Sequence, residues 1–317
     1  MLVKTPVLRW KTNGITIAGL SGQSGNASNR LSGPVDVVLD WTNNLYIADA
    51  NNNRIQKYLS TFTTGQTIAG TGENGSTPSQ LYNPSRLLLD KNENLYISDS
   101  YNTRVQFWNK GATNGSTVAG VTGVYGAANN LFNIPYGLAH NPISDTLYVS
   151  DYQNHRIMSY PSGVKNGTKI FGGNGAGTSD TQLYTPIGLH YDAFSNSLFI
   201  GNFRAHNIIQ YVFGATNWTL IAGNRNGTSG ATSMSFNYCT DMTLDPMGNV
   251  YVSDRENHRI QFFPSGEVNG TTIAGITGIM VRNDTTLYRP WAVRLDSQLN
   301  LYVADTYNHR IQKFLRY

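Results

Sequence analysis

Aspartate and arginine residues recur five positions apart along the chain, a spacing that could form ion pairs or an anion-binding ring. The pairs are Asp49/Arg54, Asp99/Arg104, Asp151/Arg156, Asp254/Arg259 and Asp305/Arg310. Each pair brackets a short polar segment that suits a hairpin turn, where a carboxylate can accept N–H groups and bind the guanidinium. At a sixth place with the same spacing, the Asp is replaced by Asn202 and the Arg by Asn207. Pairing between units would then leave two charges without partners, so we predict structural pairs within each unit.

Histidines offer a second kind of chemistry, metal binding. Four share the repeat position before the Arg or its replacement: His155, His206, His258 and His309. Equivalent positions on neighbouring packed sheets lie about 10 Å apart. Zinc needs its nitrogen ligands within about 2.1 Å, so these four histidines cannot share a zinc ion. His140 and His190 lie five and four residues after a proline, so we expect them to face different ways. The single cysteine, Cys239, excludes an intramolecular disulfide and a cysteine-based metal site. We therefore expect no metal and no cofactor.

Three sequence markers keep one period of about 51 residues, the first sign of a repeat architecture. The Asp or Asn of the ion-pair position recurs at intervals of 50 to 52 residues. A TIAG-like phrase ends at Gly19, Gly70, Gly120, Gly172, Gly223 and Gly275. The third marker occupies Pro34, Pro84, Pro135, Pro186, Cys239 and Pro290. Three markers with the same spacing predict six copies of one structural unit.

Each unit contains four short apolar segments, typical of a four-stranded propeller blade. In the first unit these are VDVVLD, NLYIAD, RIQKY and the TIAG phrase. The first TIAG phrase (Thr16–Gly19) precedes every other predicted strand, and no such phrase follows the last unit. The N-terminal strand should therefore complete the C-terminal blade. We predict an all-β, six-bladed propeller of antiparallel blades, forming one domain over residues 1–317.

The repeated pattern P-x-x-x-x-x-D … L-Y-[IV]-[AS]-D-x-x-N-x-R-[IV]-Q resembles the NHL repeat over nearly the whole chain. The resemblance implies the propeller fold. It leaves function open, because the family includes RNA-binding domains of tripartite-motif ubiquitin ligases, receptor-kinase sensors, extracellular modules and a peptide-amidating lyase. That lyase carries zinc-ligand histidines just after the inner-strand prolines. The matching positions here hold no histidine, so the lyase activity is not expected: Val35, Ser85, Tyr136, Ile187, Thr240 and Trp291.

Positions that vary between repeats are the better binding candidates, since the constant ones build the scaffold. The most variable residues follow the prolines, and we select Asp36, Arg86, Tyr136, Asp241 and Trp291 as a site at one mouth of the central channel. The alternative is that Tyr136 and Trp291 fill the axis. Apolar residues before the prolines should anchor the long connections: Leu31, Leu81, Leu131, Leu183, Phe236 and Leu287.

Composition favours a binding scaffold outside the cell. Charged residues make up 13% of the chain and the net charge is +4, which is weak support for nucleic-acid binding. No apolar run approaches the length of a membrane span. Eight N-x-[ST] sequons fall in predicted connections and suggest N-glycosylation: Asn26, Asn74, Asn114, Asn166, Asn217, Asn226, Asn269 and Asn283.

We expect a secreted, monomeric, non-enzymatic module whose partner is a protein, peptide or glycan. The first alternative is an RNA-binding domain, for which Arg86, Arg289 and Arg294 would supply positive charge. The second is a metal-dependent lyase or hydrolase, in which Asp36 and Asp241 could approach an axial ion. Two acids are few ligands for calcium, which takes six to eight oxygens.

Overall fold

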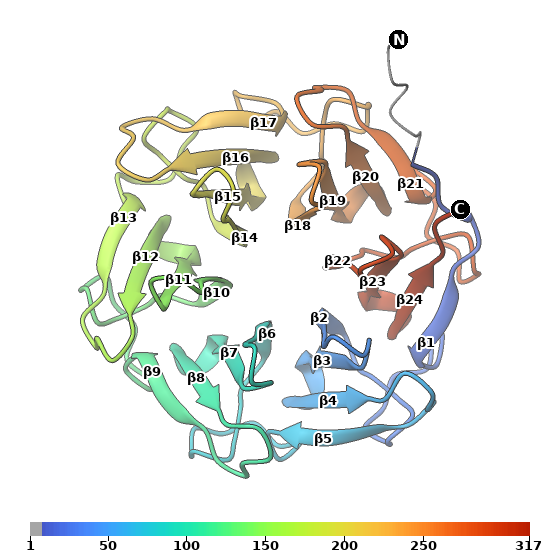
Figure 1. Ribbon diagram of the computed structural model, residues 1–317, viewed down its shortest axis with the longest axis horizontal. Helices are drawn as coiled ribbons and strands as arrows, with labels where there is room; N and C mark the ends of the chain where they lie inside the picture. Colours follow the sequence, from blue (N-terminus) through green and yellow to red (C-terminus); the bar gives the residue numbers. More distant parts are fainter. Residues whose placement is uncertain (1–7) are drawn as a thin grey trace.

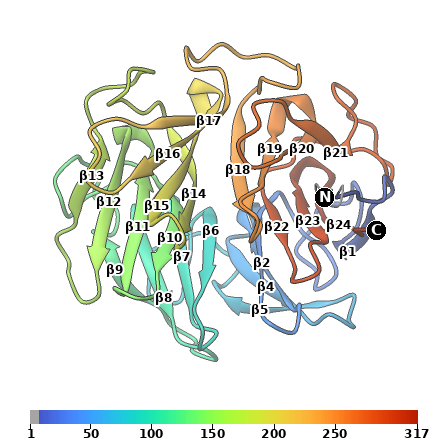
Figure 2. The same cartoon turned by 45° about the horizontal axis from the view of Figure 1, so that its top comes forward.

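The computed structural model describes residues 8–317, whose strands form six four-stranded antiparallel sheets around one axis (Figure 1). This arrangement confirms the six-bladed β-propeller. Residues 1–7 of the expected domain lie outside the described residues. The innermost strand of each blade lines the axis, and the following strands lie progressively farther out (Figures 1 and 2).

The first three blades follow the chain from the centre outwards. Blade 1 contains β2 (Pro34–Leu39), β3 (Leu45–Asp49), β4 (Arg54–Tyr58) and β5 (Gly65–Ala69). Blade 2 contains β6 (Pro84–Leu89), β7 (Leu95–Asp99), β8 (Arg104–Trp108) and β9 (Ser116–Gly120). Blade 3 contains β10 (Pro135–Asn141), β11 (Thr146–Asp151), β12 (Arg156–Pro161) and β13 (Thr168–Gly172).

The remaining blades repeat this order, except that the last one recruits the first strand. Blade 4 contains β14 (Pro186–Asp192), β15 (Ser197–Asn202), β16 (Asn207–Val212) and β17 (Thr219–Gly223). Blade 5 contains β18 (Cys239–Leu244), β19 (Val250–Asp254), β20 (Arg259–Phe263) and β21 (Thr271–Gly275). Blade 6 contains β22 (Val293–Leu295), β23 (Leu301–Asp305), β24 (Arg310–Phe314) and β1 (Ile15–Gly19).

Strand β1 pairs antiparallel with β24, with Ile15 opposite Lys313 and Gly19 opposite Arg310. Figure 1 shows this blue N-terminal strand on the outside of the red C-terminal blade. The predicted closure is therefore confirmed: the two ends of the described chain are tied together within one sheet.

A single 3₁₀ turn joins the second and third strands of every blade. These turns are η1 (Ala50–Asn52), η2 (Ser100–Asn102), η3 (Tyr152–Asn154), η4 (Phe203–Ala205), η5 (Arg255–Asn257) and η6 (Thr306–Asn308). The residue after each turn has a left-handed backbone, with φ between 50° and 60°. Asn tolerates this conformation well, and the position holds one Asn, one Thr and four His residues.

The hydrophobic core lies between neighbouring blades. Between blades 1 and 2, for example, Ala48 and Ile55 belong to the same buried cluster as Leu81 and Leu87. Burial of such side chains contributes roughly 1.5–3 kcal/mol each, so contacts between blades supply much of the stability.

Each long connection is anchored by one fully buried apolar residue three positions before the proline or its replacement. The anchors are Leu31, Leu81, Phe132, Leu183, Phe236 and Leu287. The expectation for Leu131 was wrong, because Phe132 occupies the repeat position in blade 3 and packs against Tyr160.

Candidate functional site

Each repeated Arg binds the Asp of its own blade, not that of a neighbour. The Arg Nε to Asp Oδ2 distance is 2.7–2.8 Å in all five pairs, and every Asp is fully buried. In blade 1, Asp49 Oδ1 also accepts the backbone N–H of Ser32 at 2.6 Å. The Nη groups of Arg54 donate to carbonyls of the incoming loop, including that of Asn26. The pair therefore holds its loop in place and leaves no free charge for a ligand.

Blade 4 keeps the loop contact without charges. Asn202 Oδ1 accepts the N–H of Tyr184 at 3.1 Å, and Asn207 donates to the carbonyl of Asn224 at 3.0 Å. Two neutral amides thus replace the ion pair together, which avoids a buried unpaired charge.

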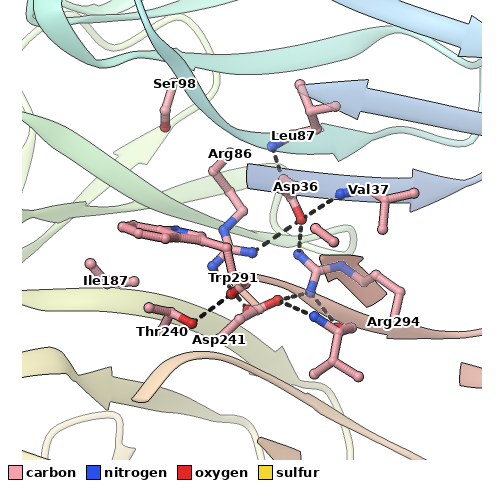
Figure 3. Close-up of polar contacts among 12 residues, drawn as sticks. Asp36, Val37, Arg86, Leu87, Ser98, Ile187, Thr240, Asp241, Trp291 and Arg294 are labelled. Atoms are coloured by element: carbon pink, nitrogen blue, oxygen red, sulfur yellow. Dashed lines mark hydrogen bonds and ion pairs between the residues drawn. The ribbon is translucent and has the colours of Figure 1, made fainter. Parts of the chain in front are cut away.

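Four charged side chains meet at the propeller axis and form the axial charge ring: Asp36, Arg86, Asp241 and Arg294 (Figure 3). Arg86 lies 3.2 Å from Asp36 and 2.9 Å from Asp241. Arg294 lies 2.9 Å from Asp36 and also binds Asp241. Asp36, Arg86 and Asp241 are at most 1% exposed, so they lie inside the axis rather than at the surface of a mouth.

Burial and ion pairing act in opposite directions on the pKa values of this ring. It raises the pKa of Asp36 above its usual range, although Arg294 and Arg86 act in the opposite direction. Burial alone would lower the pKa of Arg86, but the carboxylates of Asp241 and Asp36 outweigh it and raise that pKa. Two acids and two arginines balance, so the ring closes the axis as a neutral group.

The ring is asymmetric because only four blades contribute to it. The residue two positions after the proline is glycine in blades 3 and 4, at Gly137 and Gly188. A Cβ atom at Gly137 would lie 2.2 Å from the carbonyl oxygen of Ile187. The close approach of these two blades therefore leaves no room for a charged side chain there.

Aromatic side chains cover one end of the axis. Trp291 and Tyr136 stack with ring centroids 6.1 Å apart, as in the alternative in which they fill the axis. Phe203 contacts Trp291 and packs on Tyr238, and the Arg255 guanidinium lies 4.8 Å from the Trp291 ring centre. The connected rings form what we call the aromatic network: Tyr136, Tyr152, Phe203, Tyr238, Tyr288, Trp291 and Tyr307.

The aromatic network retains unused hydrogen-bonding capacity. Trp291 Nε1 and Arg255 Nε are buried and have no acceptor among residues 8–317. Arg289 lies over the Tyr307 ring and pairs with Glu256 at 2.9 Å. Aromatic rings with arginine are the usual composition of binding hot spots. Tyr152, Phe203 and Arg255 were missed by the sequence analysis, although the position after the repeated Asp varies as much as the one after the proline.

The four repeat-position histidines connect neighbouring blades. The Nδ1 atoms accept backbone N–H groups of the next blade's entry loop, from Thr185, Tyr238, Arg289 and Gly33, at 2.9–3.2 Å. Asn53 makes the same contact to Asn83 in blades 1 and 2. Elsewhere, His140 binds Asp145 and stacks on Tyr96. No group of three or more metal-ligating side chains occurs in the described part of the chain.

These contacts predict a pH-dependent stability. Burial lowers the pKa of His155, His206, His258 and His309, and each accepting Nδ1 requires the neutral ring. Their contribution should be complete above pH about 6.5 and lost as the pH falls through the lowered pKa. We expect His206→Asn, which copies the Asn53 contact, to remove about 1 kcal/mol of the stability change between pH 7.5 and 5. Urea unfolding of both proteins at the two pH values checks this, and an unchanged pH dependence would contradict it.

All eight sequon asparagines are exposed and lie outside the 24 strands. Within residues 8–317, no helix is long and apolar enough to cross a membrane. Cys239 is buried in the proline position of blade 5 and donates weakly to the carbonyl of Asn207.

The NHL family model, described as "NHL repeat", matches three of the blades, at residues 31–58, 236–263 and 287–314. These matches coincide with blades 1, 5 and 6 of a closed six-bladed ring. The chain is an NHL-repeat β-propeller. It is 26% identical over 212 residues to the Arabidopsis thaliana protein SUPPRESSOR OF QUENCHING 1, chloroplastic. That alignment covers 57% of this NHL-repeat propeller and 20% of the plant protein.

Solved structures share the fold at low identity. An auxiliary nutrient binding protein from Bacteroides thetaiotaomicron superposes with a TM-score of 0.72 at 15% identity, covering 97% of this chain and 77% of that one. A gluconolactonase from Xanthomonas campestris superposes with a TM-score of 0.64 at 11% identity, covering 99% and 96%. The same propeller architecture therefore serves binding proteins and enzymes, and the function depends on the local site.

Proposed function

We propose that this NHL-repeat propeller is a non-enzymatic binding module that takes a protein, peptide or glycan on the aromatic network. The observation that carries the proposal is the concentration of rings and arginines at one end of the axis, where Tyr307 is 39% exposed. The axial charge ring beneath supports these residues and is itself buried. A rigid, preformed surface of this kind lowers the entropic cost of binding.

Binding to arrayed glycans and peptides tests the proposal. We expect Arg255→Ala and Tyr307→Ser each to weaken ligand binding by at least about fivefold, because such anchors contribute about 1 kcal/mol or more. Trp41→Ser is the control, since Trp41 is 86% exposed in the β2–β3 turn at the other end of the blades. Binding that survives both aromatic-network variants would contradict the proposal. Salt-sensitive binding of single-stranded RNA alone would favour the RNA-binding alternative.

We further propose that the module works outside the cell and carries N-glycans. The support is the exposure of all eight sequon asparagines in connections. The intact mass of protein from its native source should fall by one or more glycan masses after enzymatic removal of N-glycans. An unchanged mass would contradict glycosylation and remove this support for secretion.

A further inference from the structure

The central channel has a second opening at the end away from the aromatic network. The inner strands begin beside Tyr136 and Trp291 and run toward the turns between first and second strands. Their later residues line a cavity of about 340 Å³ that is open to solvent, which we call the axial cavity. All six blades contribute to its lining, which includes Leu39, Leu89, Leu138, His190, Thr243 and Arg294. Small-molecule sites have volumes of this order. Polar and apolar atoms contribute about equally to the exposed lining of this cavity.

Two polar side chains in the lining of this cavity, His190 and Thr243, keep free hydrogen-bonding groups, and of these only His190 offers two ring nitrogens. Across residues 8–317, no hydrogen bond reaches either of its ring nitrogens, whereas His140 on the neighbouring blade is held by Asp145 at 2.9 Å. Burial and the nearby Arg294 lower the pKa of His190 to about 4. The imidazole is therefore neutral near pH 7 and presents one donor and one acceptor.

The other charges at the cavity are already neutralised. Arg294 forms part of its lining, and its guanidinium binds Asp36, Asp241 and the carbonyl of Val293. A charged ligand would have to compete with these partners, and transfer of an unpaired charge into an apolar site is costly. An uncharged polar group can instead exchange hydrogen bonds with His190.

We propose that the axial cavity binds a small uncharged molecule that combines apolar surface with one hydrogen-bonding group, and that His190 is its polar contact. The leucine-rich wall provides the apolar surface, and the free imidazole selects the polar group. The turns at this end of the blades also carry exposed apolar side chains, such as Trp41 and Phe194, so the surface around the cavity mouth is partly apolar. The site is separate from the aromatic network and stands without the function proposed for it.

The test uses the full chain with ¹³C-labelled leucine and methionine methyl groups and two probes of equal shape, phenol and toluene. We expect phenol to shift the NMR signals of cavity methyls, including Met242, and to bind more tightly than toluene by about fivefold, as one neutral hydrogen bond predicts. His190→Phe should abolish this preference and leave toluene binding unchanged. His190→Gln, which keeps a donor and an acceptor, should retain it.

His309→Asn is the control, because this histidine lies at the opposite end of the blades and connects blade 6 to blade 1. It should bind both probes like the wild type. Three results would overturn the proposal: no shift of cavity methyls at the solubility limit of either probe, a phenol preference that persists in His190→Phe, or tighter binding of benzoate than of phenol. The absence of methyl shifts and the tighter binding of benzoate are both measured on the wild type, so these two results can overturn the proposal even if a variant fails to fold.

Discussion

Arg86→Met is expected to lower the free energy of unfolding by about 3–5 kcal/mol. The guanidinium of Arg86 is 1% exposed and lies between Asp36 and Asp241. Methionine keeps much of the side-chain volume but leaves two buried carboxylates with one arginine, Arg294. The penalty therefore comes from an uncompensated charge in a site that water does not reach, and urea unfolding at pH 7.5 measures it.

The loss should also depend on pH. The pKa of Asp36 is already raised by burial, and removing Arg86 raises it further. A carboxyl group whose folded pKa is raised stabilises the fold at low pH, and this contribution disappears as the pH rises through that pKa. The difference between wild type and Arg86→Met should therefore be smaller at pH 5 than at pH 8. Comparison at each pH cancels the histidine contribution common to both proteins.

Two further variants isolate the charge effect. Arg86→Met combined with Asp36→Asn restores neutrality, and we expect it to be more stable than Arg86→Met alone. Lys110→Met removes a cation that is 61% exposed and paired with Glu93, and surface pairs contribute at most about 1 kcal/mol. A loss below 1 kcal/mol for Arg86→Met, equal to that of Lys110→Met, would show that the axial charge ring does not stabilise the fold.

The blade structure was predictable because its determinants recur. Strand pairing, the ion pair and the loop anchor lie within one unit of about 51 residues, so six copies report the same local physics. The closure of the ring followed from the same count, since one TIAG phrase precedes the first complete unit. Even the error at Leu131 is local: the position three residues before the proline, here Phe132, decides which side chain is buried.

The axial charge ring could not be predicted from the repeat, because its members are not equivalent. Asp36, Arg86 and Asp241 lie two residues after the proline position, whereas Arg294 lies four residues after it. Asp36 and Arg294 are separated by 258 residues and meet only because the ring closes. From their place next to the prolines, we expected Asp36, Arg86 and Asp241 to be exposed at the channel mouth. In the structure they are buried and form ion pairs within the axial charge ring. The rings of the aromatic network come from five different repeat positions, of which only the one directly after the proline was predicted as a binding position.

Replacing the repeated ion pair of one blade tests why the Asp and the Arg are replaced together in blade 4. Asp254 is fully buried, and its Oδ2 accepts from Asn257 and from Arg259 at 2.8 Å each. We expect Asp254→Asn to lower the free energy of unfolding by about 3–5 kcal/mol, because Arg259, only 3% exposed, then lacks its counter-charge. Asparagine still offers an oxygen to the N–H of Asn237, so the loss measures the charge rather than the loop contact.

The second replacement is expected to recover part of that loss. Asp254→Asn with Arg259→Asn copies blade 4, where Asn202 accepts the N–H of Tyr184 in the entry loop and Asn207 donates to Asn224 after β17, both through neutral hydrogen bonds. Independent effects would make the double variant less stable than Asp254→Asn, whereas a coupled pair makes it more stable. Urea unfolding of the three variants, including Arg259→Asn alone, gives the interaction energy directly. An additive result would mean that the joint replacement in blade 4 does not reflect the cost of a buried unpaired arginine.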